Sequence, residues 1–224
     1  MKTTTIRFAL LSLAMAGSVA AHAQAAGSWL VRAGVTNITP DVTSGDLSAP
    51  SLAGTKSDVG ASTRLGGGIT YIVNEHFSLD MPLALPFKHT LTGDGAIAGV
   101  GKIGDVKVLP MTLFAQYRFG EPTAAFRPYV GAGPTYAKFF KERSTATLSG
   151  LTGGTPANPT TLSVESKLVP TIQLGGTWTL NERWFVDAMV AKTFLKTRTT
   201  LSTGQTLDIK LDPVTVSVAV GMRF

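Results

Sequence analysis

The chain of 224 residues contains no cysteine, so neither disulfide bonds nor thiol chemistry contributes to its stability or function. Charge is also scarce, because Asp, Glu, Lys and Arg together make up only 15% of the residues. The net charge of +6 is spread thinly without a basic run, which argues against nucleic acid as a partner. After residue 23 no apolar run is long enough for a membrane-spanning helix. Yet 44% of the residues are hydrophobic, so the apolar residues must be dispersed along the chain.

The first 23 residues have the organisation of a secretory signal peptide. Lys2 and Arg7 give a positively charged start, residues 8–19 are apolar or small, and Ala21-His22-Ala23 matches a small-residue cleavage site. We therefore expect residues 1–23 to be removed, which leaves residues 24–224 as one exported domain. Because only Lys2 and Arg7 are charged in the signal, the mature net charge is +6 − 2 = +4.

Apolar residues recur at every second position of the mature chain, which is the period of a β-strand. The closing segment LDPVTVSVAVGMRF shows the pattern, with valines on one face and small or polar residues on the other. In the segment FSLDMPLALPFK the same alternation places Phe87 on the apolar face and Lys88 on the opposite face. Strands are predicted over residues 29–36, 65–73, 77–88, 109–119, 127–140, 171–180, 184–190 and 211–224.

The connections between these segments alternate in length. Long connections cover residues 38–60, 89–105, 141–164 and 199–207, and short turns lie around residues 74–76, 121–123 and 181–183. Aromatic residues cluster beside the short turns: Phe77, Tyr117, Phe119, Trp178, Trp184 and Phe224. This pattern predicts an all-β fold, an eight-stranded antiparallel transmembrane β-barrel with short periplasmic turns and long extracellular loops. A soluble β-sandwich, the alternative, does not explain why the connection lengths alternate.

The strand faces opposite the apolar ones are predicted to line the lumen, and at their periplasmic ends they carry charges of both signs. These residues are Arg32, Asp80, Arg118, Asp187 and Arg223. Charges inside a narrow barrel must pair or stay hydrated. Our hypothesis is a polar plug in which the two aspartates bridge the arginines. The alternative is a catalytic or ion-selective site.

Towards the extracellular end the same inward faces become apolar. We expect an apolar funnel there, formed by Pro82, Pro86, Val108, Pro110, Val169, Ile209, Leu211 and Pro213. An apolar funnel above a polar plug predicts that a hydrophobic solute enters from outside and leaves sideways. Prolines within predicted strands remove hydrogen bonds from the ladder. They indicate either a lateral opening or bulges that curve the barrel.

Enzymatic chemistry has little support in the sequence. The mature chain contains only two histidines, His76 and His89, and neither has a positioned nucleophile and orienting acid beside it. No cluster has the spacing of metal ligands. We therefore predict no enzymatic activity, no metal and no cofactor.

Five stretches resemble the outer-membrane protein W (OmpW) family: LALPFKHTL, LPMTLFAQYRFG, FRPYVGAGPTYAKFF, LNERWFV and the closing LDPVTVSVAVGMRF. They occur in order and span most of the mature chain. The resemblance implies an eight-stranded barrel in the outer membrane of a Gram-negative cell, with a narrow apolar channel that passes small hydrophobic compounds.

The expected partners follow from this assignment. They are outer-membrane lipid, small hydrophobic solutes and, during biogenesis, the barrel assembly machinery. Outer-membrane barrels commonly end on an aromatic residue that this machinery recognises, a role that Phe224 fits here. The alternative function is a surface receptor or a membrane-integrity barrel whose long loops are the working parts.

Overall fold

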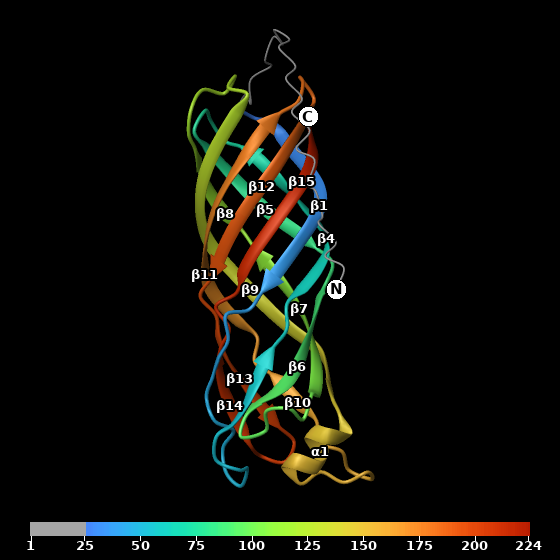
Figure 1. The fold of residues 1–224 in the computed structure, drawn as a ribbon. Helices are drawn as coiled ribbons and strands as arrows, with labels where there is room; N and C mark the ends of the chain where they lie inside the picture. The colour runs from blue at the N-terminus through green and yellow to red at the C-terminus, as the bar shows by residue number, and fades with distance from the viewer. Residues whose placement is uncertain (1–25) are drawn as a thin grey trace, which may run out of the picture.

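Eight antiparallel passes of the chain close into a barrel in the computed structural model, which describes residues 26–224 (Figure 1). Around the barrel the strands follow the order β1 (Trp29–Thr39), β4 (Ser62–Ile72), β5 (Phe77–Ala84), β8 (Phe114–Arg118), β9 (Phe126–Ser144), β11 (Lys167–Thr179), β12 (Trp184–Thr193) and β15 (Val214–Arg223). Each pairs with its neighbours, and β15 pairs with β1 to close the ring. The predicted eight-stranded antiparallel barrel is therefore confirmed. The predicted signal peptide, residues 1–23, lies outside the described residues and stays a prediction.

The first and last strands meet over almost their whole length. Ala33 lies opposite Val220, and Gly34 lies opposite Ala219. Backbone groups of a membrane-spanning strand must find their partners within the protein, because hydrocarbon offers none. Closure between β1 and β15 therefore removes the free edges that would otherwise face lipid.

The outer face of the barrel is apolar, as the period-two pattern predicted. Leu65, Leu168 and Leu174 are 66%, 70% and 61% exposed, respectively. At the end with the short turns, the rings of Phe77 and Phe119 both make edge contacts with Tyr117. Such a wide apolar surface with aromatic residues at one end suits contact with lipid. We refer to this surface as the apolar band.

The extracellular half contains the remaining elements and divides into two sheets. These elements are β2 (Thr43–Ser44), β3 (Thr55–Val59), β6 (Phe87–Gly95), β7 (Lys102–Thr112), α1 (Ala146–Thr152), β10 (Leu162–Val164), β13 (Lys196–Leu201) and β14 (Thr206–Lys210). One sheet contains β3, β6, β7 and the upper part of β9, and the other contains β10, β13, β14 and β2. In Figure 1 this half, with α1 at its tip, lies at the bottom. The segments predicted as long loops therefore contain much β-structure.

A break between β5 and β6 changes which side chains face inward. The break falls at Leu85 and Pro86. Beyond it Phe87 and His89 are buried, whereas Lys88 is exposed. The regular alternation of FSLDMPLALPFK predicted Phe87 outward and Lys88 inward. This was wrong, because the alternation of inward and outward side chains shifts by one position at the break.

Candidate functional site: an apolar chamber above a charged cluster

The periplasmic half of the lumen contains a buried pair of opposite charges. Arg32 Nη1 and Nη2 donate to Asp80 Oδ1 and Oδ2 at 2.8 Å and 3.0 Å. Thr70 donates its hydroxyl to Asp80 Oδ1 at 2.6 Å, and Arg32 Nε lies 3.5 Å from Asp187 Oδ1. The side chains of Arg32 and Asp80 are 5% and 0% exposed. Arg32 thus contacts both of the aspartates that were expected to bridge arginines.

Asp187 is held by further donors from neighbouring strands. The hydroxyl of Tyr129 donates to it at 3.1 Å, and the hydroxyl of Thr177 donates at 3.0 Å. The guanidinium carbon of Arg118 lies 5.0 Å from the centre of the Tyr129 ring, and Arg118 Nε donates to Ser78 at 3.1 Å. Together Arg32, Asp80, Arg118, Tyr129 and Asp187 form what we call the charged cluster.

Arg223 lies nearer the periplasmic opening than the charged cluster. Its Nη2 donates to the Thr179 hydroxyl at 2.6 Å, and its guanidinium carbon lies 5.9 Å from the Phe185 ring centre. The predicted polar plug includes Arg223 together with the other four charges, and it lacks Tyr129 and the fully buried Arg127. Both missed residues face inward on β9, where the same face continues through Gly131 and Gly133 and so hides the alternation.

Above the charged cluster four threonine hydroxyls form a continuous hydrogen-bonded chain. Thr112 lies 2.7 Å from Thr135, Thr135 lies 2.6 Å from Thr171, and Thr171 lies 3.0 Å from Thr193. The four residues come from β7, β9, β11 and β12, which follow one another around the wall. This hydroxyl chain separates the charged lower lumen from an apolar upper lumen.

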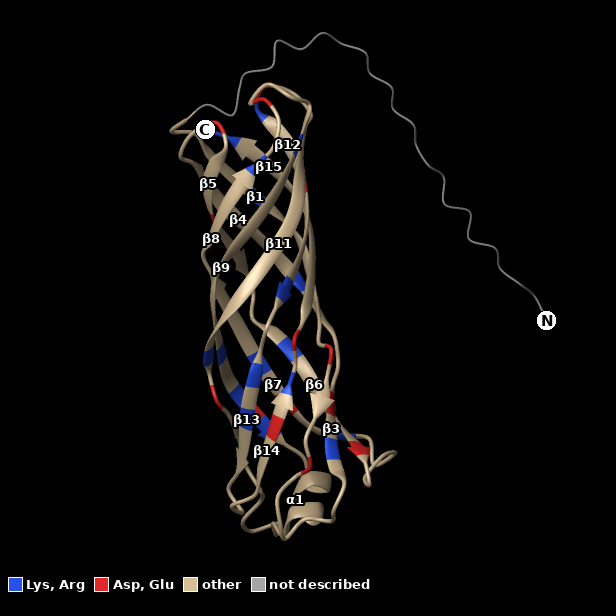
Figure 2. Ribbon diagram, turned by 90° about the vertical axis from the view of Figure 1, so that its left-hand side faces the viewer, with Lys and Arg blue, Asp and Glu red and all other residues tan. Residues whose placement is uncertain are grey.

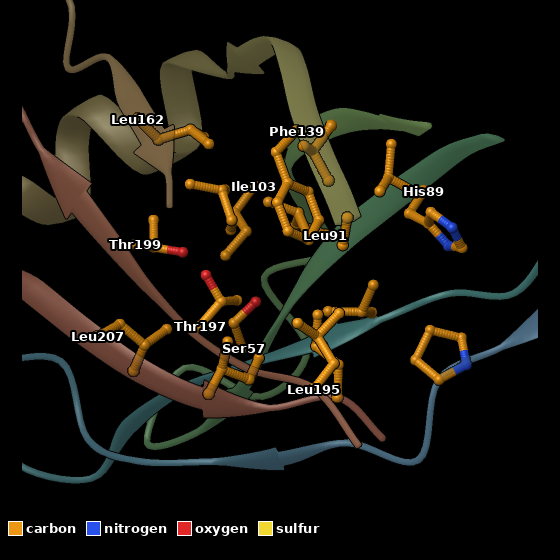
Figure 3. A pocket seen from close by; sticks show the side chains of 18 of the residues that line it. Ser57, His89, Leu91, Ile103, Phe139, Leu162, Leu195, Thr197, Thr199 and Leu207 are labelled. Carbon is orange, nitrogen blue, oxygen red and sulfur yellow. The ribbon is translucent and has the colours of Figure 1, made fainter. Parts of the chain in front are cut away.

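The upper lumen is a cavity of about 120 Å³, which we call the chamber (Figure 3). Figure 3 shows Leu91, Ile103, Phe139, Leu195 and Leu207 around the space, together with the polar side chains of Ser57, His89, Thr197 and Thr199. Thr135 and Thr193 of the hydroxyl chain line its lower end, and the buried Leu148 of α1 lines it near the tip. A dry cavity of about 150 Å³ is large enough to bind benzene. The volume of the chamber is close to this value, which suits a small apolar molecule.

Most of the residues predicted for the apolar funnel lie at the chamber. Val108, Pro110, Ile209, Leu211 and Pro213 line it, and Val169 packs against the same apolar core. The chamber has no contribution from the other two, Pro82 and Pro86. Pro82 lies deeper, opposite Gly68 at the level of the Arg32 guanidinium, and Pro86 lies in the break between β5 and β6.

His89, one of the two histidines of the mature chain, lines the wall of the chamber. Its Nδ1 lies 2.7 Å from the Gly60 carbonyl oxygen. Burial lowers the pKa of His89 below its usual value, and the nearby Arg64 lowers it further, although the bond to Gly60 opposes this. The imidazole is therefore neutral at pH 7 and adds no charge to the chamber.

The wall beside the chamber has a gap in its backbone pairing. Within residues 26–224 no strand ladder joins the upper part of β9 to β10. Two weaker contacts cross there instead, from Phe139 N to Ser166 Oγ at 3.1 Å and from Val164 N to Glu142 Oε1 at 3.4 Å. We call this unpaired stretch between β9 and β10 the β9–β10 seam. Below it β9 pairs with β11, and there Pro134 lies opposite Pro170. The carbonyl oxygens of the two prolines accept from Leu113 N and Phe194 N, so their missing donors face the outer neighbours of the two strands and not the seam.

Two other kinds of site are not found in the described part of the chain. No group of three or more His, Asp or Glu side chains is arranged to hold a metal ion. No helix between residues 26 and 224 is long and apolar enough to span a membrane.

A closed eight-stranded barrel with an apolar outer face and a mixed-charge lumen defines an outer-membrane β-barrel protein. The model of the OmpW family matches residues 25–224, and the chain belongs to that family. Its sequence is 32% identical to outer membrane protein W of Vibrio cholerae and 30% identical to that of Escherichia coli, with all of each chain covered. The predicted family and the outer-membrane location are confirmed, and so is the prediction that the protein is not an enzyme.

Solved structures show the same fold. The crystal structure of the outer membrane protein OprG from Pseudomonas aeruginosa is similar with a TM-score of 0.79 and 27% identity, over 89% of this chain and 97% of that one. The solid-state NMR structure of the outer membrane protein AlkL is similar with a TM-score of 0.65 and 23% identity, over 89% and 91% of the two chains.

Proposed function

We propose that this barrel admits small hydrophobic molecules from outside the cell and releases them sideways into the outer membrane. The observation that carries the proposal is the change of character along the lumen, from the apolar chamber to the buried charged cluster. An apolar solute gains by leaving water for the chamber. Below it the solute would have to break apart paired, desolvated charges, which is strongly unfavourable.

The β9–β10 seam is our candidate for the exit. Phe139 and Val164, on its two sides, both line the chamber. Because no strand ladder crosses the seam, opening it costs fewer backbone hydrogen bonds than opening a paired part of the wall. Leu168 and Tyr136, on the outer face beside the seam, are exposed towards the lipid. A solute that left the chamber here would meet hydrocarbon directly.

One relative supports a role with apolar compounds. A protein of Pseudomonas aeruginosa named as a dibenzothiophene metabolism operon protein is 24% identical over 200 residues, which is 88% of each chain. Dibenzothiophene is an apolar aromatic compound. The apolar lining of the chamber suits solutes of this chemical class.

The test compares entry of a hydrophobic solute with entry of a hydrophilic solute of similar size, in cells with and without the barrel. We expect a selective gain for the hydrophobic solute. A Val108→Trp substitution fills the chamber and should abolish the gain, whereas Leu109→Trp, one residue along and facing outward, should preserve it. Equal gains for both solutes would indicate a general pore. No gain for either would favour the receptor or membrane-integrity role.

The exit needs a test of its own. Replacing Glu142 and Ser166 together by Ala removes the two side-chain contacts that cross the β9–β10 seam. We expect faster solute entry with unchanged expression and folding. Unaltered entry would show that the solute does not leave through this seam.

The terminal residue supports a second partner, the barrel assembly machinery. Phe224 is 69% exposed, and its backbone exchanges two hydrogen bonds of 2.9 Å with Trp29. Its side chain is therefore available outside the closed barrel. Replacing Phe224 by Ser should reduce assembly in cells while leaving refolding of the purified chain intact. Normal assembly in cells would argue against recognition of this residue.

A further inference from the structure

The lysines of this barrel are confined to one end. Every lysine of residues 26–224 lies in the extracellular half or at its boundary with the apolar band, and the basic groups at the periplasmic turns are arginines. Figure 2 shows many of the basic residues in the half that carries α1. The ammonium groups of the barrel are therefore gathered on the extracellular side of the membrane.

Two pairs of lysines are placed directly opposite each other on adjacent strands. Lys88 of β6 faces Lys107 of β7, and Lys196 of β13 faces Lys210 of β14. The two pairs belong to the two different sheets of the extracellular half. Like charges directly opposite each other destabilise a β-sheet. The same unfavourable pairing of two lysines thus occurs twice. A negatively charged group beside each pair would offset the repulsion.

Carboxylates of the protein compensate only half of this charge. Lys88 Nζ lies 3.3 Å from Asp105 Oδ2, and Lys210 Nζ lies 3.0 Å from Asp212 Oδ2. Lys107 and Lys196 have no carboxylate within 4.0 Å among the residues that the structure describes. One lysine of each pair is therefore left without an internal counter-ion.

All four side chains point away from the lumen. Lys88 lies between the buried Phe87 and His89, and Lys107 lies between the buried Val106 and Val108. In the other sheet, Lys196 lies between the buried Leu195 and Thr197, and Lys210 lies between Ile209 and Leu211. The ammonium groups are thus presented on the outer surface.

The apolar band begins directly beneath the first pair. On β7 the next outward positions below Lys107 are Leu109 and the exposed Met111. Lys138, exposed on β9, lies opposite Leu109, and Tyr136 is the next outward residue below it. Two residues of strand correspond to roughly 7 Å. A molecule that covers Met111 and Tyr136 with hydrocarbon therefore places its polar end at Lys107 and Lys138.

We propose that the Lys88–Lys107 and Lys196–Lys210 pairs bind the phosphate groups of outer-leaflet lipid. The partner must have acyl chains for the apolar band and an anion at the boundary between chains and head group. Clusters of lysine beside a membrane surface attract lipids of this kind. In a Gram-negative outer membrane the lipid with this chemistry is lipopolysaccharide, whose lipid A carries phosphates on its sugars. The proposal is independent of solute passage through the chamber.

Native mass spectrometry of the purified barrel tests this with three probes: bisphosphorylated lipid A, the same lipid without phosphates, and inorganic phosphate. The test variant is Lys107→Gln/Lys196→Gln. The matched control, Lys56→Gln/Arg183→Gln, removes two positive charges far from the boundary. We expect the phosphorylated lipid to bind the test variant roughly twenty-five-fold more weakly than the parent, about fivefold for each lysine, and the control to bind like the parent.

Three results would overturn the proposal: equal binding of the lipid without phosphates, unchanged binding by the test variant, or inorganic phosphate binding as tightly as the lipid. The last result would assign the lysines to a soluble anion. Heat-modifiable mobility in gels verifies that each variant is folded. A Lys107→Arg/Lys196→Arg variant retains the charge and should retain binding even if the glutamine variant folds poorly.

Discussion

Arg32 and Asp80 form a bidentate pair across a strand that lies between them. Arg32 belongs to β1 and Asp80 to β5, and β4 separates these two strands in the wall. Gly68 of β4 makes the contact possible, because a Cβ at this residue would lie 2.9 Å from Arg32 Nη2. The Arg32 guanidinium thus passes over β4 at Gly68, a residue without a side chain.

Removing the negative charge of this pair should destabilise the barrel strongly. An Asp80→Asn substitution leaves the buried Arg32 with Asp187, 3.5 Å from its Nε, as its remaining carboxylate partner. Breaking one partner of a buried ion pair costs about 3 kcal/mol or more, and urea unfolding in lipid vesicles measures this loss. The control is Asp208→Asn, because Arg198 and Asp208 have the same bidentate geometry at 2.7 Å and 2.8 Å but are exposed. Equal stability of the Asp80→Asn variant and the parent would contradict a structural role for the charged cluster.

The hydroxyl chain gives a second prediction about stability. Thr171 lies in its middle, bonded to Thr135 and Thr193. A Thr171→Val substitution keeps the shape and removes both bonds, so we expect a loss of about 1–2 kcal/mol in the free energy of unfolding. The exposed Thr39, which donates to Asn37 at 2.8 Å, provides the control, since Thr39→Val should change the free energy by less than about 0.5 kcal/mol.

Acid should lower the stability of the extracellular half through His89, which lines the chamber. The pKa of His89 is lowered in the folded protein. As the pH falls below 6.5, His89 is therefore protonated in the unfolded chain before it is protonated in the folded chain. The stability associated with neutral His89 is therefore complete above pH 6.5 and is lost as the pH falls towards the folded pKa. Protease resistance of the extracellular half, followed from pH 7.5 to pH 4.5, measures this, and His89→Gln should flatten the upper part of the profile. An unchanged profile in that variant would assign the acid response to other groups, such as Asp105.

A glycine of the wall gives a prediction about close packing. A Cβ on Gly67 would lie 2.0 Å from the backbone oxygen of Arg32, so Gly67→Ala should prevent normal pairing of β1 and β4 and reduce the yield of folded barrel. The control is Gly150→Ala in α1, where a Cβ would meet nothing within 4 Å. This control should fold normally. Normal folding of Gly67→Ala would show that the wall relaxes more than the close contact suggests.

The membrane-spanning part of the fold was predictable because it follows one rule. In β15 the apolar residues from Val214 to Met222 alternate with small and polar ones without interruption. The observed strand covers the same residues as this alternation. The extracellular half breaks that rule. Register shifts between Leu91 and Thr92, and between Asp105 and Lys107, disrupt the period, so these strands were expected to be loops.

The site was predictable only in its composition. The alternation placed Arg32, Asp80 and Asp187 in the lumen, but which charge meets which depends on how far each strand is offset from the next. The offset between two neighbouring strands cannot be predicted from a single sequence. The hydroxyl chain shows this most clearly, since Thr112 and Thr193 are 81 positions apart and are joined only through the registers of β7, β9, β11 and β12.

Of the eight passes, only β9 runs from end to end as one strand, over the 19 residues from Phe126 to Ser144, and each of the other seven is interrupted once. The barrel thus consists of a membrane-embedded half and an extracellular half, which we call the lower and upper modules. Only β9 runs through both modules without a break. The interruptions are natural junctions for chimeras, because a foreign extracellular module could be joined at seven short connectors and one point on β9. Exchange of the upper module between relatives could change which molecules are admitted while the membrane-embedded module keeps its sequence.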